Sequence, residues 1–106
     1  EFSHELSAKV GARIKSFGHA GDGNLHIYVL KDDLGEGDWQ DKLTQAMDEM
    51  YAKARELQGE VSGEHGIGFA KKEFLHRSLD PESIELMRGI KAVFDPKNLL
   101  NPNKIF

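Results

Sequence analysis

The sequence contains no cysteine, which excludes disulfides, thiolate zinc sites and iron–sulfur clusters and leaves His, Asp and Glu as the strong metal ligands. It also lacks an apolar run of about 18 residues and a charged-then-apolar leader, so we expect no transmembrane segment in these residues and no secretory signal is visible in them, while an upstream signal stays open. Its lysines and arginines are scattered among acids and the net charge is -4, which argues against a nucleic acid partner. These absences favour a cytoplasmic protein, and a peripheral position at a membrane stays open.

The size of the chain limits what it can hold. With 106 residues, 39% hydrophobic and 30% charged, it is long enough for one modest hydrophobic core and too hydrophobic to be disordered. A redox enzyme with its own cofactor domain is usually larger. We therefore expect residues 1–106 to form a single domain, either a small protein or a fragment of a larger one.

The first half of the chain predicts a helix, two strands and a long helix. Helical spacing of apolar residues leads to a stop at Gly11, and residues 12–18 and 25–30 are strand candidates that the loop HAGDGN joins as a hairpin. Residues 39–57 repeat apolar side chains every three or four positions, which predicts an amphipathic helix with Asp38 as N-cap and Gly59 as stop. We expect this apolar stripe to form the core.

The second half predicts one more short strand, at residues 60–62, and then helices. Residues 71–75 suit a helical turn or two, and Asp80 followed by Pro81 is a strong start for a helix that Pro96 ends. The last residues alternate turn formers with apolar side chains, which indicates an ordered tail. The predicted fold class is α+β, a partial ferredoxin-like sandwich in the order β-β-α-β followed by C-terminal helices.

Two histidines, His19 and His26, flank the first glycine-rich loop and can converge on one point. Gly21 and Gly23 supply the positive φ angles that we expect in so tight a reversal. Two imidazoles and one carboxylate suit a divalent cation such as Zn, Mn or Fe, with either Asp22 or Glu64 as the acid. The alternative is an ordinary hairpin turn with solvated histidines.

A second glycine-rich loop, GEHGIG at residues 63–68, places Glu64 and His65 between glycines. It lacks the spacing of a dinucleotide-binding fingerprint or a phosphate-binding loop. The alternative is a loop that needs glycine for its geometry and exposes both side chains. His4 and His76 have no such context and are expected to be surface residues.

Three motifs taken together resemble the C-terminal domain of FAD-linked oxidases. They are GHAGDGNLH at residues 18–26, SGEHGIG at residues 62–68 and FDPKNLLNPNKIF at residues 94–106, in the order and spacing of that family. The family includes the FAD-binding subunit of glycolate oxidase, D-lactate dehydrogenases and D-2-hydroxyglutarate dehydrogenase. Tyr28 stands where some hydroxyglutarate-type members have asparagine, which argues against a hydroxyglutarate substrate. The chain resembles most the glycolate or D-lactate type.

The resemblance implies a role for each motif. His19, His26 and Glu64 correspond to the metal ligands of metal-binding members, and Asp22 would then only shape its loop. His65 corresponds to a general base beside substrate and flavin, and Asn101 to an asparagine near the flavin ring. Asn103 replaces the family's usual glycine, which asparagine can do in the left-handed region.

The resemblance also implies partners that lie outside this chain. Family members hold FAD mainly through an N-terminal domain, so we expect residues 1–106 alone to bind no FAD tightly and to be inactive. The implied function is the oxidation of a small 2-hydroxy acid to a 2-oxo acid with hydride transfer to flavin, with an electron-acceptor subunit as a further candidate partner. The alternatives are a stand-alone ferredoxin-like module that binds a metal or ligand, and a metal-dependent hydrolase.

Overall fold

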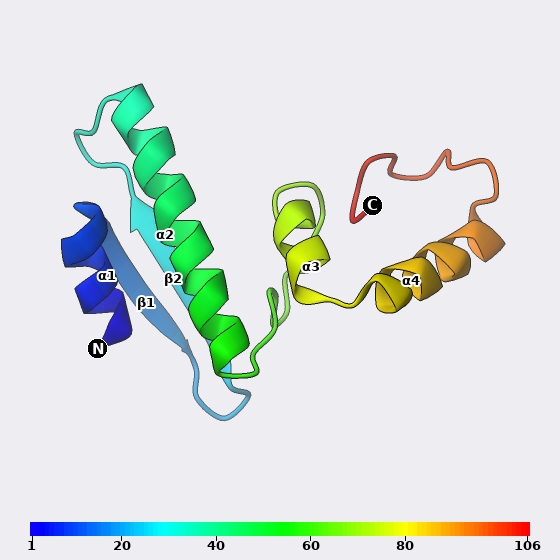
Figure 1. The fold of residues 1–106 in the computed structure, drawn as a ribbon, viewed down its shortest axis with the longest axis horizontal. Helices are drawn as coiled ribbons and strands as arrows, with labels where there is room; N and C mark the ends of the chain where they lie inside the picture. Colours follow the sequence, from blue (N-terminus) through cyan, green and yellow to red (C-terminus); the bar gives the residue numbers. More distant parts are fainter. The chain divides into compact units, whose positions relative to one another are not determined.

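The computed structural model describes all of residues 1–106, which divide into two compact units, Glu1–Gln58 and Gly59–Phe106. The first unit contains a helix, a hairpin and a long helix, and the second contains two helices and a tail (Figure 1). In chain order the elements are α1 (Phe2–Val10), β1 (Arg13–His19), β2 (Asn24–Leu30), α2 (Glu36–Glu56), α3 (Lys72–Ser78) and α4 (Pro81–Phe94).

The two strands of the first unit form an antiparallel hairpin with the predicted boundaries shifted by about one residue. Arg13 pairs with Leu30 at the open end, and His19 pairs with Asn24 at the loop. Successive side chains of a strand point to opposite faces. Ile14, Ile27 and Val29 therefore face the helices and contribute to the hydrophobic core, while Phe17, His19, His26 and Tyr28 share the other face.

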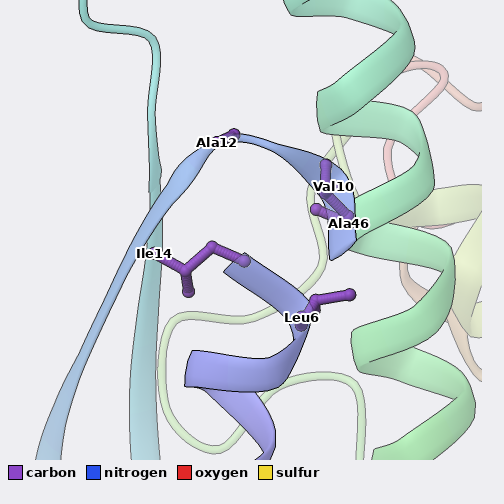
Figure 2. Close-up of a cluster of buried hydrophobic side chains, with 5 residues drawn as sticks. All are labelled: Leu6, Val10, Ala12, Ile14 and Ala46. Carbon is purple, nitrogen blue, oxygen red and sulfur yellow. The ribbon is translucent and has the colours of Figure 1, made fainter. Parts of the chain in front are cut away.

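The core of the first unit lies where α1, β1 and α2 meet. Leu6 and Val10 are one helical turn apart on α1, and they meet Ile14 of β1 and Ala46 of α2 (Figure 2). Ala46 is fully buried, and its small side chain permits a close approach of α2. Gly11 ends α1 in the left-handed conformation, with φ 68°, and its amide donates to the Ser7 carbonyl. The predicted stop at this glycine is confirmed.

The long helix α2 begins three residues before the predicted start. Gly35 is the N-cap, and Asp38 lies in the first turn instead of capping it. Its carboxylate is still favourable there because acidic side chains near a helix N-terminus interact with the helix dipole. At the other end Gln58 takes the left-handed conformation, with φ 59°, where the sequence predicted a stop at Gly59. The predicted core stripe is right for Ala46 and Met50 but not for Leu57, which is exposed.

The second unit contains α3, α4 and an ordered tail. Pro81 is the first residue of α4 after Asp80, as predicted, and the fixed φ of proline suits that position. Asp95 follows the helix and accepts hydrogen bonds from the Leu99 and Leu100 amides at 2.8 and 2.9 Å. These bonds turn the chain back after α4, so the tail is ordered as predicted.

The prediction of a short strand at residues 60–62 is wrong. The sheet has two strands, and residues 59–62 are irregular. A strand needs a neighbouring strand to pair its backbone N–H and C=O groups, and these residues pair with neither strand of the sheet. The apolar residue that suggested a strand, Val61, buries its side chain without joining the sheet. The fold is α+β, but the order is a helix, two antiparallel strands and then helices, and the β-β-α-β pattern fails at its last strand.

Candidate functional site

The two histidines of the first loop lie side by side on the hairpin. His19 ends β1 and His26 is the third residue of β2, so both project from the same face. Their ring centroids are 5.6 Å apart and their planes are nearly perpendicular, at 84°. His26 is partly buried and His19 is exposed. The hairpin therefore converges the two imidazoles, as the sequence predicted.

An aromatic stack that the sequence did not predict packs against His26. The Phe17 ring stacks on the His26 ring with centroids 5.2 Å apart, and Tyr28 stacks on Phe17 at 5.4 Å. Phe17 is the cross-strand partner of His26, and such pairs are neighbours on one face. The sequence pattern that could have revealed the stack is the alternation of Phe17 with His19 and of His26 with Tyr28. It places all four side chains on one face of the hairpin.

The glycines of this loop have different roles. Gly23 has φ +65°, as predicted, but Gly21 is not in the left-handed region. Gly18 is required for a reason that the sequence did not reveal, because a Cβ added there would lie 2.1 Å from the Asn24 carbonyl oxygen. The Asp22 amide donates to the His19 carbonyl at 3.1 Å and closes the turn.

The spacing of the two imidazoles suits a shared cation. With metal–nitrogen bonds of about 2.0–2.1 Å and a tetrahedral angle, the centroids of two coordinating imidazoles lie about 5 Å apart. The separation of 5.6 Å is close to that value. Zinc, manganese and iron all accept neutral imidazole, so this pair fits the cations expected from the sequence.

The second loop holds Glu64 and His65 in the other unit. Gly66 and Gly68 have φ angles of +73° and +56°, so the loop does need glycine for its geometry. The His65 Nε2 atom lies 3.4 Å from a carboxylate oxygen of Glu64, and both side chains are exposed. A neutral imidazole has one ring nitrogen that can accept a proton, so His65 can act as a base.

The tail that carries Asn101 is held by backbone hydrogen bonds. The Ile105 amide donates to the Gly68 carbonyl at 2.8 Å, and the Ile105 carbonyl lies 2.9 Å from the His76 ring. His76 was predicted to be a surface residue, but it is partly buried and ties the tail to α3. Asn101 and Asn103 have φ angles of 47° and 61°, so the expectation that asparagine at position 103 adopts the left-handed region is confirmed.

Asn101 lines an open apolar groove of about 440 Å³ between α4 and the tail. Asp95 lies at the same end of α4 and is almost fully buried. Its hydrogen bond from the Lys91 ammonium, at 2.6 Å, lowers the pKa of the Asp95 carboxyl, and the Leu99 and Leu100 amides act in the same direction. The carboxylate therefore stays charged and holds the start of the tail.

A family model described as "FAD linked oxidases, C-terminal domain" matches residues 1–105 of the chain. The chain belongs to the FAD-linked oxidase family. Its relatives include a D-lactate dehydrogenase of Anaerostipes hadrus, 50% identical over 104 residues, and the glycolate oxidase subunit GlcD of Bacillus subtilis, 44% identical over 103 residues. A D-2-hydroxyglutarate dehydrogenase of Stutzerimonas stutzeri is 39% identical over 111 residues.

These matches cover nearly all of this FAD-linked oxidase domain but a small part of each relative. They span 98%, 97% and 99% of the chain, and 22%, 22% and 24% of the respective relatives. The resemblance read from the three motifs is confirmed. None of the helices is long and apolar enough to cross a bilayer.

Proposed function

We propose that residues 1–106 form the substrate- and metal-binding C-terminal part of an FAD-dependent dehydrogenase that oxidises a small 2-hydroxy acid to a 2-oxo acid. The observation that carries this proposal is the convergence of His19 and His26 on one face of the hairpin of a chain in the FAD-linked oxidase family. The names of two relatives, a D-lactate dehydrogenase and a glycolate oxidase subunit, support short 2-hydroxy acids as the substrate class.

In this proposal His19, His26 and Glu64 hold a divalent cation of the zinc, manganese or iron type. Two neutral imidazoles and a carboxylate are the donor set of catalytic sites that keep a position open for substrate. When bound, the cation would supply a Lewis acid for the oxygens of the hydroxy acid, and the flavin would supply the hydride acceptor. Phe17 packs on His26 and limits the rotation of that ring.

His65 is the proposed general base that takes the hydroxyl proton of the substrate. A neutral imidazole has one nitrogen that donates and one that accepts. If the Nε2 nitrogen, 3.4 Å from Glu64, carries the hydrogen, the Nδ1 nitrogen is the acceptor for the proton.

Asn101 is the proposed contact to the flavin ring. Its left-handed backbone, and the hydrogen bond from the Lys104 amide to its carbonyl at 3.3 Å, fix a tight turn at the edge of the apolar groove. We propose that FAD is held mainly by the polypeptide that precedes this domain in the family. The 106-residue chain alone is then expected to bind FAD weakly and to show no dehydrogenase activity, which a flavin titration and a dye-reduction assay would check.

Metal binding by the purified chain tests the ligand assignment. Titration calorimetry with Zn²⁺ and Mn²⁺ should detect a site in the wild type that is weakened at least about tenfold in His19→Ala and in Glu64→Ala. His4→Ala is the matched control because His4 is an exposed histidine on α1, and its affinity should equal that of the wild type. Equal affinities in all four proteins would refute the assignment.

A further inference from the structure

The second unit gathers basic side chains around one groove. The groove has a volume of about 450 Å³ and is lined by residues of α3, α4 and the tail. Lys72, Arg88 and Lys104 line it, one from each of these segments, and Lys91 is the fourth basic residue. Asp95 is the single acidic residue of the lining, so the side chains around the groove carry a formal charge of +3. The whole chain carries -4, and the groove is therefore a local concentration of positive charge on an acidic protein.

Contacts between the tail and the start of α3 bring these cations together. The Ile105 amide donates to the Gly68 carbonyl at 2.8 Å, which returns the tail from the end of α4 to the residues before α3 (Figure 1). The Nζ atom of Lys104 lies 5.4 Å from the centre of the Phe69 ring. Lys72 begins α3 three positions after that ring. The cations converge because of the fold, and the sequence shows no basic run at any of these positions.

Aromatic rings position two of the cations without neutralising them. The guanidinium carbon of Arg88 lies 5.0 Å from the centre of the Phe106 ring, in the same kind of contact that Lys104 makes with Phe69. A ring attracts a cation through its quadrupole and carries no formal charge. The carboxylate of Glu85 lies 3.4 Å from Arg88, but the Glu85 side chain is 75% exposed, and solvent weakens such a pair. The positive charge of both cations stays available to an anion.

The acidic residue of the lining is already paired. The Lys91 ammonium donates to the Asp95 carboxylate at 2.6 Å and to the Leu100 carbonyl at 3.2 Å. Asp95 also accepts two backbone hydrogen bonds, so its charge is satisfied within the unit. The side chain of Lys72, by contrast, makes no ion pair or hydrogen bond with another residue and is partly buried at the groove.

We propose that this basic groove binds the phosphate groups of a small molecule of the pyrophosphate type. Arg88 presents a planar fork of donors and Lys72 and Lys104 present point charges, which together suit the several oxygens of such an anion. Three cations without a buried acidic partner exceed what one carboxylate needs. The volume lies in the range of small-molecule sites and leaves room beside Phe106 for the organic part of the ligand. The proposal is independent of the histidine pair and of the oxidation of a hydroxy acid.

An extended polyanion such as a nucleic acid fits this surface less well. With +3 at the groove and -4 in total, the remainder of the chain carries -7. A long polyanion would bring further phosphates against that negative surface, and like charges brought together are unfavourable. A small anion is confined to the groove and avoids this repulsion.

Titration calorimetry with sodium pyrophosphate tests the groove. The chain is first freed of divalent cations on a chelating resin and is kept in a phosphate-free buffer of low ionic strength, because salt screens exposed charges. The variants are Lys72→Gln and Lys104→Gln, and Lys72→Arg retains the charge. The matched control is Lys97→Gln, which removes the same charge from an exposed lysine of the same unit that does not line the groove. Thermal unfolding shows that each variant is folded.

We expect the wild type to bind pyrophosphate at one site, with the affinity lowered at least about tenfold in Lys72→Gln and in Lys104→Gln because each loses a charge-assisted hydrogen bond. Lys97→Gln and Lys72→Arg should bind as the wild type does. The absence of binding by the wild type would overturn the proposal. An equal loss in Lys97→Gln would replace the site by a general attraction of anions, and equal affinities for succinate and pyrophosphate would reject phosphate as the ligand class. If Lys72→Gln does not fold, Lys104→Gln decides.

Discussion

The substitution Gly18→Ala should damage the hairpin that carries both candidate histidine ligands. The new Cβ atom would lie 2.1 Å from the Asn24 carbonyl oxygen, whereas real contacts of this kind do not fall below 3.0 Å. The backbones must therefore separate by about 1 Å where Gly18 pairs with Leu25. Forcing extra atoms into a packed site costs about 1–3 kcal/mol. In a domain of this size each kcal/mol lowers the melting temperature by about 4–8 °C.

The same change should weaken cation binding, because it moves the two histidine-bearing strands apart. Thermal unfolding by circular dichroism gives the stability, and titration with Zn²⁺ gives the affinity. The matched control is Gly21→Ala in the same loop, where an added Cβ meets no atom within 4 Å and φ is not positive. It should leave the melting temperature unchanged or slightly raised, since alanine restricts the unfolded chain. A melting temperature of Gly18→Ala equal to that of the wild type would refute the close approach of the two strands at this position.

Three further changes test other parts of the structure. Leu6→Ala removes the most completely buried large side chain and should lower the free energy of unfolding by about 2–5 kcal/mol in a urea titration. The pKa of Asp95 is lowered, first by its hydrogen bond from Lys91, so its contribution to stability is present above the unfolded pKa of about 3.8 and is lost as the pH falls through the lower folded value. In Asp95→Asn the free energy of unfolding should therefore depend less on pH in the acidic range than in the wild type. An unchanged pH dependence would argue against this ion pair. Phe17→Leu removes the stack on His26 and should weaken Zn²⁺ binding about tenfold while Phe17→Tyr retains it, whereas equal affinities would assign the stack no role.

Local chemistry explains why several elements could be predicted. Gly11 ends α1 because only a residue without a Cβ adopts the left-handed conformation at little cost. Pro81 begins α4 because its fixed φ suits the first turn. The hairpin follows from alternating side chains on either side of a loop rich in glycine. Each of these features depends on residues within a few positions of one another.

The features that the sequence did not reveal depend on contacts that form only when the chain is folded. A strand at residues 60–62 would need a neighbour in the sheet, and periodicity cannot show whether one is present. His76 binds the carbonyl of a residue 29 positions away, so its role became visible only when the tail was in place. The need for glycine at position 18 arises from the approach of the opposite strand.

The sequence by itself determined the family, through three motifs in order, and it named the side chains that are candidates for chemistry. It could do so because motif identity depends on residue type and spacing alone. The tertiary structure decided that the two imidazoles of the first loop converge, that Phe17 supports one of them, and that α4 exposes the apolar side chains of Ile90, Val93 and Phe94. Those outcomes depend on which surfaces meet after folding, and helical spacing is the same whether an apolar face is buried or exposed.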